Sequence, residues 1–421
     1  MKINQKKMIE RFLRYVQIDT QSDENSTTYP STEKQLELSK LLVKEIKEIG
    51  IKEVELTDHG YVFATLPSTL PKKYDKIVPI IGLIAHVDTS PDVSGSGVTP
   101  VIHQNYQGGE ISLPKDQALV IQPETDPAIE KCLGHDIITS DGTTLLGADN
   151  KAGIAEIMTA VEFLVNNPSA LHGEIRFAFT VDEEVSQGTK YFDPKIFAAK
   201  YAYTIDGETA GELEIETFCA NTVIISVKGI NIHPGYAKNK MINSIKIASE
   251  LISQLPKDRM SPETTEKREG YVHPNTLNAN VEESTIKFLI RDFTVEGLKE
   301  KESYLENLFN SILKKHPKAS GKFRVEESYR NMRYILDQYP HVTEYAREAI
   351  ERSGLKPTIS LIRGGTDGAR LSYMGLPTPN IFTGGHNFHS KREWISIQDM
   401  LKATEVIIHL LLIWAEKGDK V

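Results

Sequence analysis

The sequence predicts an α/β domain with a mixed, mainly parallel sheet, interrupted by an inserted α+β domain. Three observations support this fold class. Several nearly continuous apolar runs end in clusters of polar residues, and helical patterns separate them, as expected for buried strands alternating with helices. A central segment, residues 214–329, departs from this alternation and has its own order of elements. The length of 421 residues is sufficient for two such domains.

The chain begins with two predicted amphipathic helices. The first lies within residues 1–17, where apolar residues recur along one helical face. A polar loop follows, in which Thr32 and Gln35 have the spacing of a capping box that opens the second helix. The predicted buried faces consist of Met8, Ile9, Phe12, Leu13 and Val16 in the first helix, and of Leu38, Leu41, Leu42, Ile46 and Ile49 in the second.

Five apolar runs predict the strands of the main sheet. They cover residues 77–88, 174–180, 201–205, 358–362 and 378–382, and polar or charged residues come at the end of each. Helices are predicted between them, notably at 151–165 and 345–354. In an α/β sheet, ligands bind in the crevice beyond the carboxyl ends of the strands. The functional residues are therefore expected at this edge.

The inserted segment, residues 214–329, predicts a lid domain. A strand-like stretch at 212–229 precedes a helix, two further strands, a long charged helix at 296–316 and a last strand at 322–329. This order resembles a split βαβ, ferredoxin-like unit. The predicted main domain therefore consists of residues 1–213 and 330–421.

Composition excludes several classes of protein. The chain has 39% hydrophobic and 25% charged residues, as in a globular protein whose core needs neither disulfides nor metal ions for stability. Its 49 Lys and Arg residues against 58 Asp and Glu residues give a net charge of −9 without a long basic run, so nucleic acid and membranes are not expected partners. Two cysteines without a CxxC motif, and no secretory or membrane-spanning run, predict a cytoplasmic location.

Several strand ends and one helix start carry residues that could bind a metal. His86 and Asp88 alternate at a strand end and so face the same side, where a carboxylate commonly orients a metal-bound imidazole. An exposed strand-end pair is an equally good interpretation. Asp149 directly precedes a helix, so it could also be a simple N-cap.

The acidic turn after the strand at 174–180 contains two adjacent glutamates that could have different roles. One of Glu183 and Glu184 could bind a metal while the other acts as a general base, although a surface acidic turn is the alternative. Asp206 also follows a buried strand, where an Asp-Gly turn is the plain interpretation. His389 lies in a loop in which His386 competes for any ligand role.

Together these residues predict a metal centre at one edge of one sheet. Two imidazoles and three carboxylates without a thiolate suit zinc, cobalt or manganese. Five ligands can hold two ions if one carboxylate bridges them. The candidate ligands are His86, Asp149, Glu184, Asp206 and His389.

Three further residues are candidates for contact with a substrate. Arg291 and Arg363 could each bind a carboxylate in the bidentate geometry that a guanidinium provides, but solvated or structural arginines are common. His233 lies beside Pro234 and Gly235, so an exposed turn residue without function explains it equally well.

With these residues assembled, the sequence resembles the M20 family of metallopeptidases, and within it the M20B tripeptide aminopeptidases. The resemblance covers most of the chain in order, including the inserted segment. It is carried by AHVDTSPDVSG, TSDGTTLLGADNKAGIAEIM, FTVDEEVSQG, DGETAGELEIETF, NIHPGYAKNKMINS, REGYVHP, IRGGTDGARLS and GGHNFHSKREW.

This resemblance implies a zinc-peptidase-like catalytic domain that holds two divalent ions, with zinc expected and cobalt or manganese as alternatives. It implies that one ion is bound by His86, Asp149 and Asp206, and the other by Glu184, Asp149 and His389. The peptide bond after Asp149 is expected to be cis by the same analogy. Asn150 stands where the family pattern usually has aspartate, but this position is not a direct ligand.

The resemblance also implies the remaining roles. Asp88 would orient His86, and Glu183 would be the general base for the metal-bridging water. His233 would stabilise the oxyanion, while Arg363 and Arg291 would hold the terminal carboxylate of a tripeptide. The expected reaction is hydrolysis of the N-terminal peptide bond of tripeptides.

Two alternatives remain open: another M20 activity, such as a carboxypeptidase, dipeptidase or deacylase, and a catalytically silent metal-binding protein. Tripeptides are the expected partners, and the edges of the inserted domain leave a homodimer as an open question.

Overall fold

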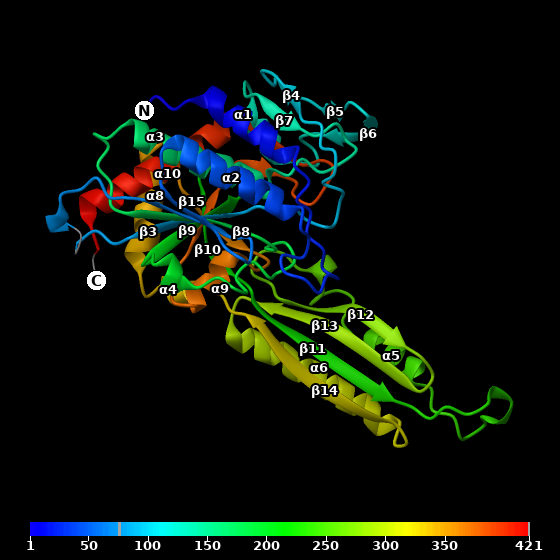
Figure 1. Cartoon of the computed structure of the whole chain (residues 1–421). Coiled ribbons are helices and arrows are strands. Elements are labelled where there is room, and N and C mark those ends of the chain that lie inside the picture. The colour runs from blue at the N-terminus through cyan, green and yellow to red at the C-terminus, as the bar shows by residue number, and fades with distance from the viewer. Residues whose placement is uncertain (75–76, 420–421) are drawn as a thin grey trace. The chain divides into compact units, whose positions relative to one another are not determined.

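The computed structural model describes residues 1–74 and 77–419 (Figure 1). It divides into two compact units. Unit 1 comprises Met1–Ile215, Tyr334–Ser360 and Thr366–Val421, and unit 2 comprises Glu216–Arg333 and Leu361–Gly365. Each unit has its own cluster of buried hydrophobic residues, so each can be described by itself.

Unit 1 is organised around an eight-stranded mixed sheet. Its centre is parallel, with β3 pairing with β8 and β9, and β9 pairing with β16, whereas β1 with β2, β2 with β8 and β10 with β16 are antiparallel. The predicted α/β fold class is confirmed. In spatial order the strands are β1 (Glu53–Leu56), β2 (Val62–Leu66), β8 (Ile175–Thr180), β3 (Ile81–His86), β9 (Tyr201–Gly207), β16 (Asn380–Phe382), β10 (Glu212–Thr217) and β15 (Thr358–Ile362).

The five apolar runs correspond to β3, β8, β9, β15 and β16. The sequence assigned the whole stretch at 212–229 to the start of the inserted domain. In the structure this stretch forms two strands, and the first of them, β10, joins the main sheet beside β16. All six residues of β3 are buried, because helices cover both faces of the parallel centre.

Helices cover the sheet of unit 1 on both sides. Figure 1 shows α2, α3 and α10 above the sheet and α4 and α9 below it. The helix α3 packs against α1, α10, β3 and β9, which explains why it is apolar around most of its circumference. The helices are α1 (Gln5–Val16), α2 (Gln35–Ile49), α3 (Ala148–Asn166), α4 (Pro194–Phe197), α7 (Arg333–Leu336), α8 (Pro340–Arg352), α9 (Asp367–Tyr373) and α10 (Ile397–Lys417).

The start of α2 differs from the predicted capping box. The Thr32 hydroxyl donates to the carbonyl of Gln21 at 2.7 Å instead of capping the helix. The Gln35 side-chain amide donates to Thr32 at 3.3 Å and to the carboxylate of Asp182 at 2.6 Å. The polar side chains at this helix start therefore connect distant segments of unit 1 rather than one turn of helix.

Short strands add a second, smaller sheet to unit 1. It has the order β17 (Gly385–His386), β18 (Trp394–Ser396), β7 (Ile137–Thr139) and β4 (Val101–His103), and β5 (Ile111–Leu113) pairs separately with β6 (Asp116–Ile121). These elements surround their own buried cluster, which includes Trp394 and Cys132. Short 3₁₀ helices cover Lys72–Tyr74 and Pro127–Cys132.

Unit 2 is a four-stranded antiparallel sheet with two helices. Its chain order is β11 (Cys219–Lys228), α5 (Ser244–Ser253), β12 (Tyr271–Ala279), β13 (Glu283–Asp292), α6 (Val295–Lys315) and β14 (Ser320–Tyr329), and its spatial order is β12-β13-β11-β14. Alternate residues of β11, namely Val223, Ile225 and Val227, are buried in the hydrophobic cluster of this unit. The 3₁₀ turns Pro234–Tyr236 and Pro262–Thr264 lie in its connections.

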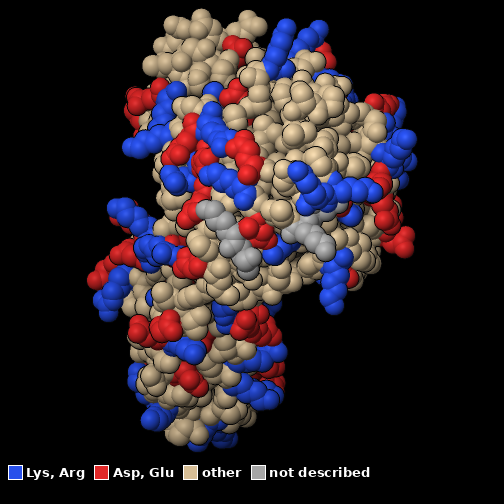
Figure 2. All heavy atoms as spheres, turned by 90° about the vertical axis from the view of Figure 1, so that its left-hand side faces the viewer, with Lys and Arg blue, Asp and Glu red and all other residues tan. Residues whose placement is uncertain are grey.

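Two further properties of the structure bear on partners. On the face shown in Figure 2, Lys and Arg residues are interspersed with Asp and Glu residues rather than gathered into a basic stripe. Within residues 1–74 and 77–419, no helix has the combination of length and apolar composition that crossing a bilayer requires.

Candidate metal centre

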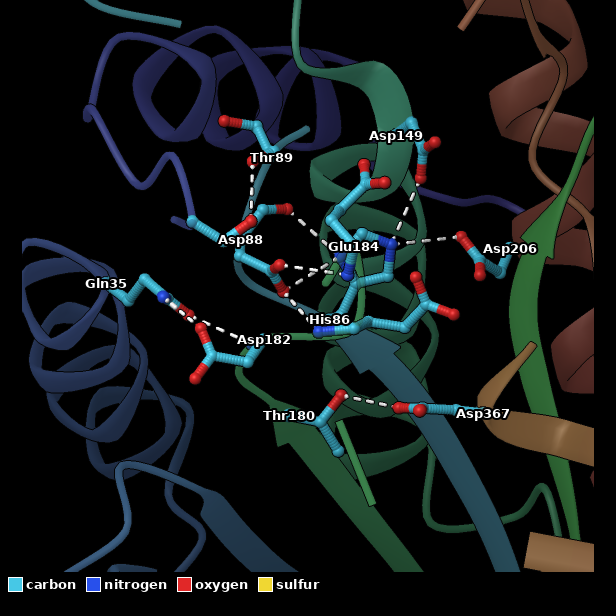
Figure 3. Close-up of polar contacts among 12 residues, drawn as sticks. Gln35, His86, Asp88, Thr89, Asp149, Thr180, Asp182, Glu184, Asp206 and Asp367 are labelled. Atoms are coloured by element: carbon cyan, nitrogen blue, oxygen red, sulfur yellow. Dashed lines mark hydrogen bonds and ion pairs between the residues drawn. The ribbon is translucent and has the colours of Figure 1, made fainter. Parts of the chain in front are cut away.

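Seven of the ten predicted site residues meet at the carboxyl edge of the parallel strands of unit 1. They come from the end of β3, the turn after β8, the end of β9, the start of α3 and the loop after β17. Figure 3 shows His86, Asp88, Asp149, Glu184 and Asp206 among them. Parallel neighbouring strands bring their carboxyl ends to one edge, so residues far apart in sequence become neighbours. The seven are His86, Asp88, Asp149, Glu183, Glu184, Asp206 and His389.

His86, the last residue of β3, is surrounded by carboxylates. Its Nε2 atom lies 3.1 Å from Oδ1 of Asp149 and 3.4 Å from Oδ1 of Asp206. Its side chain is buried, and burial alone would lower the pKa of His86. The negative charge of Asp206 and the hydrogen bonds to the carboxylates outweigh this effect and raise the pKa of His86 well above its ordinary value.

His389 contacts the other side of the same group. Its Nε2 atom lies 2.8 Å from Oε2 of Glu184 and 3.2 Å from Oδ2 of Asp149, while its Nδ1 atom lies 3.2 Å from Asp92. Desolvation alone would lower the pKa of His389. The hydrogen bonds to Asp149 and Glu184 outweigh this effect and raise the pKa to about 11. The side chain of His389 is 40% exposed, so the site opens to solvent on this side.

Asp149 is therefore placed between two imidazoles. Its Oδ1 atom faces His86 and its Oδ2 atom faces His389. Burial would raise the pKa of Asp149, but the hydrogen bonds from His389 and His86 lower it below the ordinary range. The peptide bond between Asp149 and Asn150 is cis, as expected.

The remaining carboxylates of the site are held in a desolvated environment. Burial, with the charge of Asp149, raises the pKa of Glu184 to about 8, and burial raises that of Asp206 to about 6 against the opposing effect of His86. Burial also raises the pKa of Glu183, and His86 opposes it. Within the described residues, Oε1 of Glu184 is buried without a hydrogen-bond partner.

These residues fit divalent cations. Ligand atoms of His86, Asp149 and Glu184 all lie within 4.8 Å of one another. Several buried carboxylates repel one another unless positive charge lies among them, and a mixed imidazole and carboxylate set suits zinc and its neighbours. The buried, unpartnered oxygen of Glu184 is an acceptor that a cation would satisfy.

Asp88 connects the ends of two strands. Its carboxylate lies 3.3 Å from Nδ1 of His86 and accepts hydrogen bonds from the backbone N–H groups of Glu183 and Glu184, both at 3.1 Å. The residue is fully buried. Nδ1 of His86 also lies 3.0 Å from the backbone carbonyl of Asp88, as a hydrogen-bond partner. The carbonyl and the carboxylate of this one residue thus fix the ring of His86 and the turn that carries the two glutamates.

Two buried carboxylates at this edge were not found by sequence reasoning. Glu393 accepts hydrogen bonds from the N–H groups of Leu146 and Gly147, both at 2.7 Å, and of Asp149 at 3.0 Å. Asp367, at the start of α9, accepts one from the Thr180 hydroxyl at 3.2 Å, and burial raises its pKa to about 7. The sequence contained a weak signal for both, because Glu393 lies within the motif GGHNFHSKREW and Asp367 within the motif IRGGTDGARLS.

The three predicted substrate residues lie in unit 2. His233 is exposed, and its Nδ1 atom accepts a hydrogen bond from the N–H of Gly235 at 3.2 Å. Arg291 donates to the carbonyls of Asn221 at 3.3 Å and Ile290 at 3.0 Å. The guanidinium of Arg363 donates to the carbonyls of Thr265, Lys267 and Glu269, at 3.3, 2.7 and 2.8 Å.

Comparisons with known proteins place this geometry in context. Residues 141–413 match the model of peptidase family M20/M25/M40. The chain is 47% identical to peptidase T of Bacillus pumilus over 411 residues, which cover 98% of this chain and 99% of the relative. It is 46% identical to peptidase T of Caldanaerobacter subterraneus over 412 residues, with 98% and 100% covered.

Solved structures share the fold. The crystal structure of aminopeptidase PepT from Bacillus cereus superimposes with a TM-score of 0.73 at 24% identity, covering 98% of this chain and 99% of that one. A tripeptidase from Staphylococcus aureus gives a TM-score of 0.76 at 22% identity with the same coverage.

Proposed function

Because this chain belongs to peptidase family M20/M25/M40, we propose that it is a metal-dependent aminopeptidase that removes the N-terminal residue of tripeptides. Full-length relatives at 46–47% identity carry the name peptidase T, which supports an aminopeptidase of this type. The observation that carries the proposal is the position of Asp149, whose two carboxylate oxygens face two different imidazoles. This arrangement suits a carboxylate that bridges two cations.

Five residues would hold two divalent ions, for which zinc is proposed. His86, Asp149 and Asp206 would bind one ion, and Glu184, Asp149 and His389 the other. When bound, such ions lower the pKa of a water molecule to about 7 and stabilise negative charge on a polarised carbonyl oxygen. Cobalt and manganese suit the same nitrogen and oxygen atoms, so metal analysis decides between them.

Glu183 is the proposed general base. It follows the same strand as the proposed ligand Glu184, and desolvation raises the pKa of its carboxyl group, which makes its carboxylate a stronger base. It would accept a proton from the attacking water and return it to the nitrogen of the departing amine. Asp88 would keep the ring of His86 in the required orientation through its contact at Nδ1.

Substrate recognition is proposed for three residues of unit 2. His233 would stabilise the oxyanion, and Arg363, with Arg291, would bind the terminal carboxylate. Unit 2 would thus act as a lid, and the distance between the carboxylate site and the metal centre would select tripeptides by length. The exposure of His233 is consistent with a residue available to a ligand. Alanine at Arg363 should reduce activity on a tripeptide more than on its carboxyl-amidated analogue.

A metal analysis combined with a peptide panel tests the proposed function. The purified chain should contain two divalent ions in the centre and hydrolyse tripeptides faster than dipeptides or tetrapeptides. With Met-Gly-Gly as substrate, methionine should be the first amino acid released. Release of glycine first would assign a carboxypeptidase instead, and metal binding without hydrolysis of any peptide would indicate a catalytically silent protein.

A further inference from the structure

A second cluster of metal-ligating side chains lies in unit 1, formed by Cys132, His135 and Asp399. One ligand atom of each residue lies within 4.8 Å of the ligand atoms of the other two. None of the three belongs to the proposed catalytic centre. We propose that this cluster is a separate binding site for a thiophilic divalent ion such as zinc, with a water molecule as the fourth ligand.

The local sequence brings two of these ligands together in a tight turn. Cys132 ends a 3₁₀ helix, and the N–H of His135 donates to the carbonyl of Cys132 at 2.9 Å. Between them, Leu133 has φ −57° and ψ 127° and Gly134 has φ 82°, the values of a type II turn that needs glycine at its third position. Cysteine and histidine are thus the first and fourth residues of one turn.

The third ligand comes from the first turn of α10. Ser396 caps this helix by accepting a hydrogen bond from the N–H of Asp399 at 3.2 Å, and the same hydroxyl lies 2.8 Å from Nδ1 of His135. Sγ of Cys132 lies 3.6 Å from one oxygen of Asp399, and Nδ1 of His135 lies 3.9 Å from the other. In a tetrahedral zinc site, bonds of about 2.0–2.3 Å place ligand atoms roughly 3.3–3.8 Å apart.

Charge also favours a cation at this cluster. Burial and the neighbouring charge of Asp399 raise the pKa of Cys132 to about 12, and burial raises that of Asp399. Glu156 in α3 is fully buried, and within the described residues both of its carboxylate oxygens lack a hydrogen-bond partner. Burial raises the pKa of Glu156, and the negative charge of Asp399 raises it further. A bound divalent ion would stabilise the thiolate and offset this concentration of acidic groups.

The site is also accessible. The side chain of His135 is 27% exposed, whereas Cys132 is buried. An ion can therefore reach the cluster from solvent on the histidine side while the sulfur stays protected. Three protein ligands with one open position is a common arrangement for zinc.

The two sites differ in chemistry, and this difference allows a direct test. The five proposed ligands of the catalytic centre contain no sulfur, whereas this site includes a thiolate. Cobalt bound to a thiolate shows a near-ultraviolet ligand-to-metal charge-transfer absorption that oxygen and nitrogen ligands do not produce. The full-length chain should therefore be titrated with Co²⁺ after metal removal.

The wild-type chain should bind one equivalent of Co²⁺ beyond those of the catalytic centre, and the charge-transfer absorption should appear with it. Both should be lost in Cys132→Ser. The matched control is Cys219→Ser, because Cys219 is the other buried cysteine and lies in unit 2. His135→Gln replaces a partly exposed ligand, should fold normally, and should weaken binding by at least tenfold.

Absence of the absorption from the folded wild-type chain would overturn the inference, as would its persistence in Cys132→Ser. Near-ultraviolet circular dichroism verifies the fold of each variant. The inference is independent of the proposed function: a chain with the thiolate signal but without peptidase activity would support this site and contradict the catalytic proposal.

Discussion

Asp149 shows why single residues at this site were ambiguous in the sequence. Its place before a helix favours an N-cap, because free N–H groups attract a carboxylate there. In the structure Asp149 and Asn150 have non-helical backbone angles just before the regular part of α3, and both oxygens of Asp149 face imidazoles. Only the meeting of distant strand ends distinguishes these two roles, and local spacing contains no information about it.

Glu183→Gln should separate metal binding from turnover. The variant keeps all five proposed ligands but loses the proton acceptor, so the maximal rate should fall about 10²–10⁴-fold while the metal content stays that of the wild type. Glu184→Gln is the matched comparison, since it should lose metal. Steady-state kinetics with metal analysis of both variants provide the measurement. Normal turnover in Glu183→Gln would exclude this residue as the base.

Glu393→Gln should weaken metal binding without removing a ligand. The wild-type carboxylate accepts three backbone N–H groups around Asp149, and the neutral amide can accept fewer and weaker bonds. We expect the metal affinity to fall about 10–100-fold, as for other groups that position ligands. Competition with a chelator measures it. Excess metal should restore activity, and failure to do so would assign Glu393 a different role.

At the scale of elements, an ion network joins the first three helices. Arg11 of α1 is buried, with Nη1 2.9 Å from Glu162 of α3 and Nε 3.6 Å from Glu45 of α2. Arg14 lies 2.5 Å from Glu45 on the other side, and the Tyr15 hydroxyl donates to Glu45 at 2.7 Å. Since these carboxylates are largely buried, removing one of their cationic partners should lower the free energy of unfolding of unit 1.

Arg11→Ala should destabilise unit 1 by about 1–3 kcal/mol, because it removes one cationic partner from each of two largely buried carboxylates. Arg14 still pairs with Glu45, and Lys7 still pairs with Glu162. Lys6→Ala removes an exposed partner of Glu10 on the same helix and should cost less than about 0.5 kcal/mol. Urea unfolding of both variants gives the comparison. Equal losses would mean that the buried network contributes no more than a surface pair.

The raised pKa of the buried Tyr15 predicts that the chain loses stability in alkaline solution. Burial and then the charge of Glu45 raise the pKa of Tyr15 in the folded chain well above that of an unfolded tyrosine, which is about 10. The folded state therefore binds this proton more tightly, so the contribution to stability is complete below pH 10 and is lost as pH rises above it. Between pH 9 and 11 the unfolding free energy should fall more steeply in the wild type than in Tyr15→Phe. Parallel curves would contradict this role.

The elements that the sequence predicted are those with a clear pattern. The strands β3, β8 and β9 were found because fully buried strands are nearly continuous apolar runs, and α3 because its apolar stretch is long. The small sheet of β4, β7, β17 and β18 was missed, since strands of two or three residues have no readable period. Buried acids such as Glu393 and Asp367 were missed because burial depends on tertiary contacts.

At the scale of the whole molecule, metal removal should abolish activity without unfolding the chain. The cores of both units are built from hydrophobic residues that do not depend on the metal centre. At a free metal concentration of 100 times the dissociation constant, each occupied site should stabilise unit 1 by roughly 2.7 kcal/mol. Both tryptophans, Trp394 and Trp414, are buried in unit 1, so their fluorescence reports this unit alone. Loss of native circular dichroism in the chelated chain would contradict this expectation.

The discontinuity of unit 2 has a consequence for its use as a module. Arg363 and Gly364 belong to unit 2 although they come after residue 360, and Arg363 binds the carbonyls of Thr265, Lys267 and Glu269. The Gly364 carbonyl accepts a hydrogen bond from the N–H of Phe218 at 3.3 Å. Transplanting residues 216–333 alone into another host would therefore leave these acceptors and this donor unsatisfied. A functional graft must carry the five-residue segment 361–365 as well, so recombination at two points in the gene cannot exchange this unit without also exchanging residues 334–360 of unit 1.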